Sequence, residues 1–450
     1  MTNKNVPEIE VGILKSGKIR FSLDGNFRIN RSGSLLQGEA EAFITGTTIS
    51  IHFDETRITL EEPVILEPVD QAVNRFRLRD VVIGIGFHWE QKEDQEFQGA
   101  LKLMISEGEI QVVNVISVED YLISVISSEM RGDSSPELLK AHTIISRSWL
   151  LAQIEKQDQL AGSDNAYEPE HRTEEEYIRW YDREDHVQFH VCADDHCQRY
   201  QGTTRSHNPE VVKAVNETAG EVLEFDGRIC DARFSKCCGG VVEEFQHCWE
   251  PVAHPYLQRV EDHPASSAIH SGDLKVETNA VAFIKGLPEA FCNTTDATLL
   301  RQVLNDYDQN SSDFFRWEVN YSQEEIASLV REKSGIDFGE ILDLVPVERG
   351  ESGRLVRLKI IGSKRTLIVG KELEIRRWLS SSHLYSSAFI VEKQQVKNGV
   401  PGSFLLRGAG WGHGVGLCQI GAAVMASKGY SHLEILKHYF IDATIEKQYE

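Results

Sequence analysis

The stretch from Val113 to Met130, VNVISVEDYLISVISSEM, decides the fold at the centre of this chain, because its periodicity changes there from that of a strand to that of a helix. The residues just before it, 101–113, have the alternating, β-branched pattern of a hairpin. From 118 onward apolar residues recur at helical spacing, and Ser117 with Asp120 matches a helix cap. We therefore predict a hairpin followed by a helix that begins at 118.

A second helix is predicted directly after the first. Ser135 is placed to cap it and Pro136 to occupy its first position, and apolar residues follow at helical spacing up to Ala152. The residues on the N-terminal side of the helix pair, 9–115, have the composition of strands and turns, with Asp24-Gly25 as a strong turn signal. The two helices are therefore expected to pack on strands.

The rest of the chain alternates polar segments with strands and helices. Residues 156–186 and 264–340 are polar and weakly periodic, which predicts surface insertions. Strands recur over 341–410, and helices close the chain. The expected fold class is α+β, with a β-rich N-terminal part, a central helix pair packed on strands, and C-terminal strands and helices. The predicted divisions are a β-rich N-terminal region over 1–97 and a second region over 98–450 that carries both insertions.

Composition limits the classes of function that fit. The 450 residues are 41% hydrophobic and 26% charged, which is typical of a globular protein. A formal net charge of −23 argues against general binding to nucleic acid or anionic membrane, and it favours a neutral substrate over a polyanion. The sequence has no run of about 18 apolar residues for a transmembrane helix. Residues 1–7 lack the apolar core of a secretory signal, so they do not indicate export.

The cysteines are unevenly distributed along the chain. Six of the eight fall within residues 192–248, close to several histidines. Disulfide frameworks are typical of small secreted domains, whereas this chain is large, so the clustering favours a metal site over disulfides. A structural zinc ion held by four protein side chains is the predicted form. The predicted ligands are His190, Cys192, Cys197 and Cys238, the last from the pair Cys237-Cys238, and His186 or His196 can take the place of His190.

Three blocks of sequence, in the same order, resemble the SpoIID/LytB family. The first block is the stretch 113–130, followed by PELLKA at 136–141 and SRS at 146–148. The second block is looser and consists of FDG at 225–227, FSKCCGG at 234–240 and PYL at 255–257. The third block is GWGHGVGLCQIGA at 410–422. The resemblance covers residues of about 98–262 and 341–445. Both ranges lie within the second predicted region, so the resemblance implies that this region is the catalytic one.

The resemblance implies a peptidoglycan lytic transglycosylase. Such enzymes cut the bond between N-acetylmuramic acid and N-acetylglucosamine and leave a 1,6-anhydro end, and the better-known relatives prefer glycan strands without stem peptides. It also implies a location in the cell envelope, and some relatives bind zinc through a His and two Cys. A related branch consists of amidase enhancers, which bind or modify the wall without necessarily cleaving it. An enhancer that acts with a cell-wall amidase is therefore the alternative function.

Glu129 is the residue that the resemblance places in the role of acid and base. Lytic cleavage needs one carboxyl group, which donates a proton to the leaving oxygen and then accepts one from the 6-hydroxyl of the sugar; paired-carboxylate hydrolysis needs two. Near a helix C-terminus and beside Ile126 and Met130, this carboxyl is expected to have a raised pKa. Glu119 and Asp120 are interpreted as capping or surface groups.

Further substrate contacts are predicted on the second helix and in the third block. Arg147 can bond a sugar oxygen or form a structural ion pair. Glycines alternate through 408–416 without the G-x-G-x-x-G spacing of a dinucleotide site. They let a ligand or a neighbouring backbone come close, and they leave Trp411 and His413 projecting to one face. Arg147, Trp411, His413 and Gln419 are the predicted substrate-binding residues, with a purely structural His413 as the alternative.

Overall fold

The structure is a computed structural model of the chain, and its contacts divide the chain into two compact units. Unit 1 comprises residues 1–157, 186–222 and 446–450, and unit 2 comprises residues 158–185 and 223–445. The boundary predicted near residue 97 lies inside unit 1. The structure describes residues 5–30, 34–53, 56–84, 90–131, 133–160, 169–181, 186–194, 196–205, 208–264, 271–303 and 313–450, without the side chains of 158–160.

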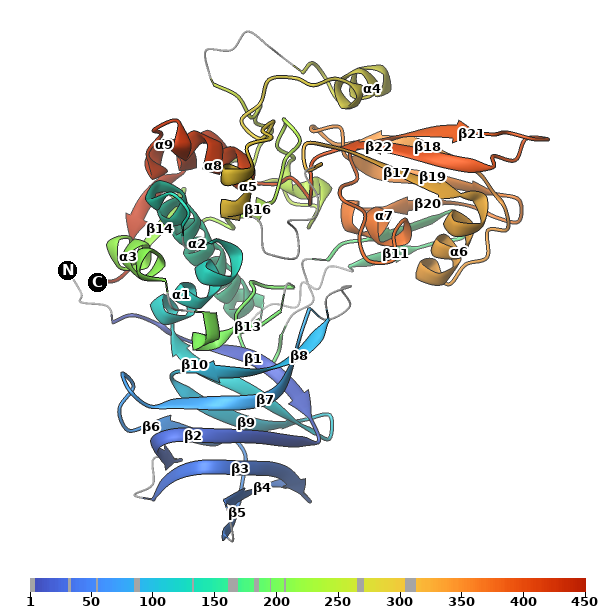
Figure 1. Cartoon of the computed structure of the whole chain (residues 1–450). Coiled ribbons are helices and arrows are strands. Elements are labelled where there is room, and N and C mark those ends of the chain that lie inside the picture. The colour runs from blue at the N-terminus through green and yellow to red at the C-terminus, as the bar shows by residue number, and fades with distance from the viewer. Residues whose placement is uncertain are drawn as a thin grey trace. The chain divides into compact units, whose positions relative to one another are not determined.

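Unit 1 is built on one large sheet, most of which is blue and cyan in Figure 1. The strand order is β13-β1-β10-β9-β6-β2-β3-β4-β5, with β7 beside β2 and β8 beside β7. The predicted hairpin is confirmed, because β9 and β10 pair antiparallel on either side of Glu107 and Gly108. The strands are β1 (Glu8–Ser16), β2 (Lys18–Ile29), β3 (Leu35–Thr45), β4 (Thr48–Phe53), β5 (Thr56–Leu60), β6 (Val64–Pro68), β7 (Arg75–Ile83), β8 (Gln91–Phe97), β9 (Ala100–Ser106), β10 (Glu109–Ser117) and β13 (Val191–Cys192).

Alternating burial explains why these segments form a sheet with one face in the core. In β2, Ile19, Phe21 and Leu23 are buried, whereas the residues between them are not. Asp24-Gly25, predicted as a turn, lies within β2, so that prediction was wrong. The pairing of β2 with β3 shifts register between Leu23 and Phe27, and Gly25 has a φ of 87°. The glycine therefore serves an irregularity within the strand rather than a chain reversal.

The helices described in unit 1 are α1 (Val118–Glu129), α2 (Pro136–Leu160) and α3 (Pro209–Glu217). They lie on one side of the sheet in Figure 1. The start predicted for α1 is confirmed: the Ser117 hydroxyl accepts a hydrogen bond from the Asp120 N–H over 3.1 Å and donates one to the Asp120 carboxylate over 2.7 Å. The second helix begins at Pro136, also as predicted.

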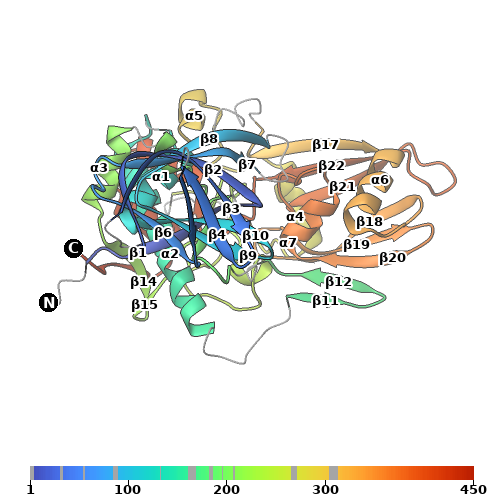
Figure 2. The same ribbon diagram turned by 90° about the horizontal axis from the view of Figure 1, so that it is seen from below.

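The larger hydrophobic core described in unit 2 joins strands of two sheets with two helices. The sheets are β11-β12-β20-β19-β18 and β17-β22-β21. Trp317, Leu358 and Phe404 from their strands pack with Val330 of the helix α6 (Gln323–Ser334) and Trp378 of the helix α7 (Glu372–Trp378). Figure 2 shows the β11–β12 hairpin beside β20. The strands are β11 (Glu170–Arg172), β12 (Glu176–Arg179), β15 (Arg228–Ile229), β16 (Phe234–Ser235), β17 (Arg316–Ser322), β18 (Ile341–Arg349), β19 (Leu355–Gly362), β20 (Thr366–Gly370), β21 (Phe389–Gln394), β22 (Ser403–Ala409) and β23 (Leu417–Cys418).

The helices described in unit 2 include a C-terminal pair. The last of them, α9, begins with a reciprocal capping box between Ser431 and Glu434. The helices are α4 (Glu277–Lys285), α5 (Ala297–Val303), α6 (Gln323–Ser334), α7 (Glu372–Trp378), α8 (Gln419–Ser427) and α9 (His432–Tyr439). The strands β14 (Glu221–Phe225) and β24 (Thr444–Lys447) lie where the chain passes from one unit to the other.

The α+β class predicted from the sequence is confirmed, with a β-rich N-terminal part. Within the predicted insertion 156–186, β11 and β12 extend the five-stranded sheet of unit 2. The predicted insertion 264–340 supplies α4, α5, β17 and α6. Among the described residues, no helix combines the length and the apolar character that crossing a membrane requires.

Candidate functional site

Glu129 is the last residue of α1, and its side chain is half-buried. Its neighbours Ile126 and Met130 are buried. The Met130 N–H donates to the Ile126 carbonyl over 2.8 Å and closes the last turn of the helix, while the Ser117 cap fixes the first turn. The carboxyl group is therefore held at the end of a well-fixed helix, beside apolar side chains and in partial contact with solvent.

The other acidic side chains of α1 have structural contacts. Asp120 caps the helix, and Glu119 binds Arg147 through two hydrogen bonds, 2.9 Å from Nε and 2.6 Å from Nη2. The Tyr449 hydroxyl donates to the same carboxylate over 2.6 Å. Arg147 is fully buried, and its Nη1 donates to the Glu221 carbonyl over 3.0 Å. For Arg147 this arrangement favours the ion pair over sugar binding, because a guanidinium with no exposed surface presents no face to a substrate.

Four side chains of unit 1, which we call the first sulfur group, have the arrangement of a metal site: His186, Cys192, His196 and Cys197. Their ligand atoms all lie within 4.8 Å of one another. The Cys197 Sγ is 3.4 Å from the His186 Nε2 and 3.5 Å from the His196 Nδ1, and the Cys192 Sγ is 3.9 Å from the His196 Nδ1. Two thiols and two imidazoles are a donor set that zinc accepts, so the chemistry of the group fits this ion.

The electrostatics of the first sulfur group favour a thiolate. The hydrogen bond with Cys197, helped by those with the two histidines, outweighs burial and lowers the pKa of Cys192 to about 2. The thiolate is the form of cysteine that binds metals. The pKa of Tyr121 is raised well above its ordinary value, chiefly by burial and further by the charges of Cys197, Cys192 and Glu129. The Glu129 carboxylate and the first sulfur group therefore act on the same buried tyrosine.

The structure changes the predicted set of zinc ligands. Cys192 and Cys197 come together as predicted, and the stated alternatives to His190 complete the group. His190 itself lies outside it, because its Nδ1 accepts the Glu10 N–H and its own N–H donates to the Glu10 carbonyl, each over 3.0 Å. Cys238 belongs to a different group in unit 2, together with Asp262, Cys292 and Cys418. Sequence reasoning missed this second group because no short spacing connects its members.

The glycines between 408 and 416 serve close packing. A Cβ at Gly410 would overlap the backbone of Cys237 and Cys238, and a Cβ at Gly416 would overlap the carbonyl of Arg233. Both glycines have positive φ, 77° and 73°, which other residues rarely adopt. The close approach of a neighbouring backbone, one of the two uses predicted for this run, is therefore confirmed.

Trp411 and His413 have different neighbours in unit 2, and both are half-buried. The Trp411 ring stacks on Phe314 with centroids 4.6 Å apart and lies 4.6 Å from the Tyr385 ring. The His413 ring meets Trp249 edge-on at 5.0 Å, and its Nδ1 accepts the Val415 N–H over 3.0 Å. A partly accessible aromatic ring is compatible with sugar binding, and the substrate roles of Trp411 and His413 stay predictions.

The surroundings of His413 favour the neutral form of its imidazole. Burial lowers its pKa well below the ordinary value, and the positive charges of Arg233, Arg354 and Arg376 lower it further. Gln419, also predicted to bind substrate, is the first residue of α8 and only 1% exposed. So little accessible surface favours a structural role for Gln419.

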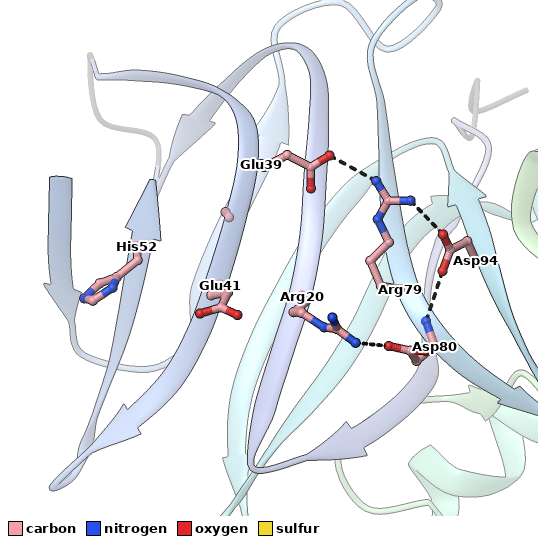
Figure 3. A pocket seen from close by; sticks show the side chains of 8 residues that line it. Arg20, Glu39, Glu41, His52, Arg79, Asp80 and Asp94 are labelled. Atoms are coloured by element: carbon pink, nitrogen blue, oxygen red, sulfur yellow. Dashed lines mark hydrogen bonds and ion pairs between the residues drawn. The ribbon is translucent and has the colours of Figure 1, made fainter. Parts of the chain in front are cut away.

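A pocket of about 610 Å³ lies on the sheet of unit 1 (Figure 3). Arg79 bridges Glu39 and Asp94 over 3.0 and 2.6 Å, and Arg20 pairs with Asp80. Opposite charges on neighbouring strands therefore compensate one another across this pocket. Its lining residues are Arg20, Glu39, Ala40, Glu41, His52, Arg79, Asp80 and Asp94, and do not include Glu129.

Two family models match separate segments of the chain, and several relatives match longer stretches of it. Residues 106–225 match the family described as Stage II sporulation protein, and residues 243–416 match a domain of unknown function, DUF8618. An uncharacterised protein of Brachyspira hyodysenteriae is 26% identical over 77% of this chain and 71% of that protein. Stage II sporulation protein D of Bacillus amyloliquefaciens is 22% identical over 73% of this chain and 74% of that protein.

A further relative is the amidase enhancer of Bacillus subtilis, 25% identical over 53% of this chain. The match covers 33% of that protein, so the chain spans about a third of the enhancer's length. Glu129 and the first sulfur group both lie inside the segment that matches Stage II sporulation protein.

Proposed function

The chain belongs to the SpoIID/LytB family, and on this premise we propose that it is a peptidoglycan lytic transglycosylase in which Glu129 acts as acid and base. The family and the relative named amidase enhancer support the coarser statement, a role connected with the cell wall. The proposed reaction cleaves the bond between N-acetylmuramic acid and N-acetylglucosamine and forms a 1,6-anhydro end. Peptide-free glycan strands are the first substrate to test.

The position of Glu129 is the observation that carries this proposal. Glu129 is the last residue of α1, half-buried beside the apolar side chains of Ile126 and Met130. A group that must give up a proton and then recover one needs a fixed place that a substrate can still reach, and the helix end offers both.

One carboxyl group is enough for this chemistry. In its acid form Glu129 donates its proton to the glycosidic oxygen as the bond from that oxygen to C1 of N-acetylmuramic acid breaks. The resulting carboxylate accepts the proton of the 6-hydroxyl of the same sugar as O6 bonds to C1, so the 1,6-anhydro ring forms and Glu129 regains its acid form. Because the sugar supplies the nucleophile, a second carboxylate to activate water is not required.

We propose that the first sulfur group holds a structural zinc ion. His186, Cys192, His196 and Cys197 together provide four protein ligands, and a closed set of four is typical of structural sites. Cys192 also lies on β13, which pairs with β1, so the ion would fasten the 186–197 segment to the sheet. In this proposal zinc supports the fold, and the proton transfers belong to Glu129.

The test is digestion of peptide-free glycan strands by the native chain and by a Glu129→Gln variant. The amide keeps the size of the side chain but can no longer donate and recover a proton, so anhydro ends should fall by at least about 100-fold. Mass spectrometry of the products measures them. Glu137→Gln, an equal change at the start of α2, is the matched control and should retain native rates. Undiminished cleavage by Glu129→Gln would remove Glu129 from this role.

The alternative function is amidase enhancement, which the similarity to the amidase enhancer of Bacillus subtilis favours. In that case sedimentation with peptidoglycan would capture the chain, an added cell-wall amidase would work faster, and no anhydro ends would appear. A metal-dependent hydrolase would behave in a third way, because a chelator would stop it while Glu129→Gln would not. Together these assays separate the three functions.

A further inference from the structure

Unit 2 contains a second sulfur group, Cys238, Asp262, Cys292 and Cys418, whose ligand atoms lie within 4.8 Å of one another. All four residues are buried, and Asp262 and Cys418 are fully so. They come from separate segments: the loop after β16, the segment before α4, the segment between α4 and α5, and the end of β23. Three thiols and a carboxylate therefore converge in the interior of one unit.

The sulfur atoms are spaced for a single ion rather than for a covalent bond. The Sγ atoms of Cys238 and Cys292 are 3.5 Å apart, whereas a disulfide needs about 2.05 Å. A tetrahedral zinc ion with bonds of about 2.3 Å separates its sulfur ligands by about 3.8 Å. The Cys418 Sγ accepts the Cys238 N–H over 3.2 Å, which keeps these two segments in register.

The surroundings of the group suit negatively charged ligands. Cys418 is the N-cap of α8, where the helix dipole favours negative charge. The Cys238 N–H, which donates to the Cys418 Sγ, directs a second dipole at the same sulfur atom. Both features suit a sulfur ligand of a cation.

Asp262 places a carboxyl group in the same buried space. Its Oδ1 accepts the Tyr439 hydroxyl over 2.7 Å, and its Oδ2 accepts the Cys292 N–H over 2.9 Å. These donors orient the carboxyl group, and the His438 Nε2 lies 3.8 Å from its Oδ1. A buried carboxylate beside a buried thiolate is costly unless a cation lies between them.

We propose that Cys238, Asp262, Cys292 and Cys418 form a buried binding site for one thiophilic divalent cation, with zinc as the first candidate. Three sulfurs and one carboxylate oxygen complete a tetrahedral set, so the site is closed and structural. It is distinct from the first sulfur group, with which it shares no residue. The inference does not depend on the proposed glycan cleavage.

The ion would fix the glycine-rich segment 408–416, which carries Trp411 and His413. Cys418 lies on β23, just after this segment. The strand β23 pairs with β16, whose residues Phe234 and Ser235 come shortly before Cys238 in the chain. At the other end of the run, the N–H and carbonyl of Trp411 pair with Cys237 over 2.8 and 3.1 Å. An ion that joins Cys238 to Cys418 therefore holds both sides of the run against the same loop.

The test uses the full-length chain with Cys192→Ser and Cys197→Ser, so that the first sulfur group no longer binds metal. Purified under reducing conditions from medium with zinc, this protein should retain about one zinc per chain by elemental analysis. Addition of Cys292→Ser should abolish that zinc, and Asp262→Asn, the milder change, should weaken zinc binding by at least about tenfold. Cobalt in place of zinc should give the visible bands of a tetrahedral thiolate site.

Cys230→Ser is the matched control, because Cys230 is a fully buried cysteine of the same unit outside the group, and it should leave the zinc content unchanged. Circular dichroism separates loss of zinc from loss of the fold, and where Cys292→Ser does not fold, Asp262→Asn decides. Absence of zinc from the folded Cys192→Ser, Cys197→Ser protein would overturn the proposal. So would full zinc retention by folded Cys292→Ser, or a Cys238–Cys292 disulfide in the reduced preparation.

Discussion

The two sulfur groups have similar donor atoms but are constructed differently. The first lies within residues 186–197, and its members are half-buried or exposed. The second draws its members from residues as far apart as Cys238 and Cys418, and all of them are buried. One group is thus a local feature of the chain at its surface, and the other is a product of the packing of unit 2.

This difference in construction predicts how much each group stabilises its unit and how fast it exchanges an ion. A short segment closed by an ion loses little chain entropy and remains open to solvent, so its ion is exchangeable. Segments that are distant in sequence close large loops when they meet, and their burial shields the ion from water. We therefore expect the second group to matter more for the stability of its unit and to exchange its ion more slowly.

The largest expected effect is on stability. Cys292→Ser should lower the free energy of unfolding by about 3–5 kcal/mol, because it leaves buried charges without their cation. Cys197→Ser should cost only about 1–2 kcal/mol, because water can replace the missing ligand at a half-exposed site. Urea unfolding of the two variants in zinc-containing buffer measures both values, and equal losses would contradict the comparison.

The next effect is on the rate of metal release. A chromogenic chelator should remove zinc from the second group at least about 100-fold more slowly than from the first, because release requires an opening of unit 2 that costs about 2.7 kcal/mol more. Cys192→Ser with Cys197→Ser should eliminate the fast phase, and Cys292→Ser the slow one. A single phase in the native chain, carrying two equivalents of zinc, would show that the groups do not differ in access.

The smallest effect concerns histidine and pH. The folded-state pKa of His413 lies well below its ordinary value of 6.5, so between these values the unfolded chain binds a proton that the folded chain does not. The contribution of neutral His413 to the free energy of unfolding is therefore fully present above pH 6.5. It is lost as the pH falls below 6.5, by up to about 1.4 kcal/mol per pH unit. His383, whose pKa is lowered to about 4 by burial and nearby cations, acts in the same direction.

Urea midpoints of the native chain and of His413→Gln at pH 7 and pH 5 measure this dependence. The variant cannot take up the proton in either state, so the acid loss of stability should be smaller in the variant than in the native chain. His171→Gln is the control, because His171 is exposed, and it should follow the native chain. An unchanged slope in His413→Gln would show that protonation of another group governs the acid response.

Sequence reasoning predicted those parts that depend on neighbours in the chain. The hairpin of β9 and β10, the Ser117 cap and the start of α2 at Pro136 were all predicted, because turns, caps and apolar periodicity act within a few residues. Glu129 was placed on the first helix for the same reason. The turn predicted at Asp24-Gly25 failed because a glycine with positive φ also fits an irregularity inside a strand.

The hydrogen-bond and ion-pair partners of the predicted site residues could not be predicted from neighbours in the sequence. The sequence left two roles open for Arg147, and only the structure shows that Glu119 is its partner. The spacing of His190 from Cys192 predicts a ligand, but in the structure the ring of His190 accepts a hydrogen bond from the Glu10 N–H instead. The spacing of residues along the chain could identify neither the partner of Arg147 nor the hydrogen bonds of His190.

From the sequence alone follow the α+β class and the helix pair, since caps and periodicity are local properties of the backbone. The candidate acid at position 129 came from the resemblance of its segment to the SpoIID/LytB family. The tertiary structure alone decided that Arg147 is an ion-pair partner, that Gln419 is buried, and that Cys238 joins Asp262, Cys292 and Cys418. The physical reason is that burial and the convergence of donor atoms arise from contacts between distant segments, which form only when the chain packs.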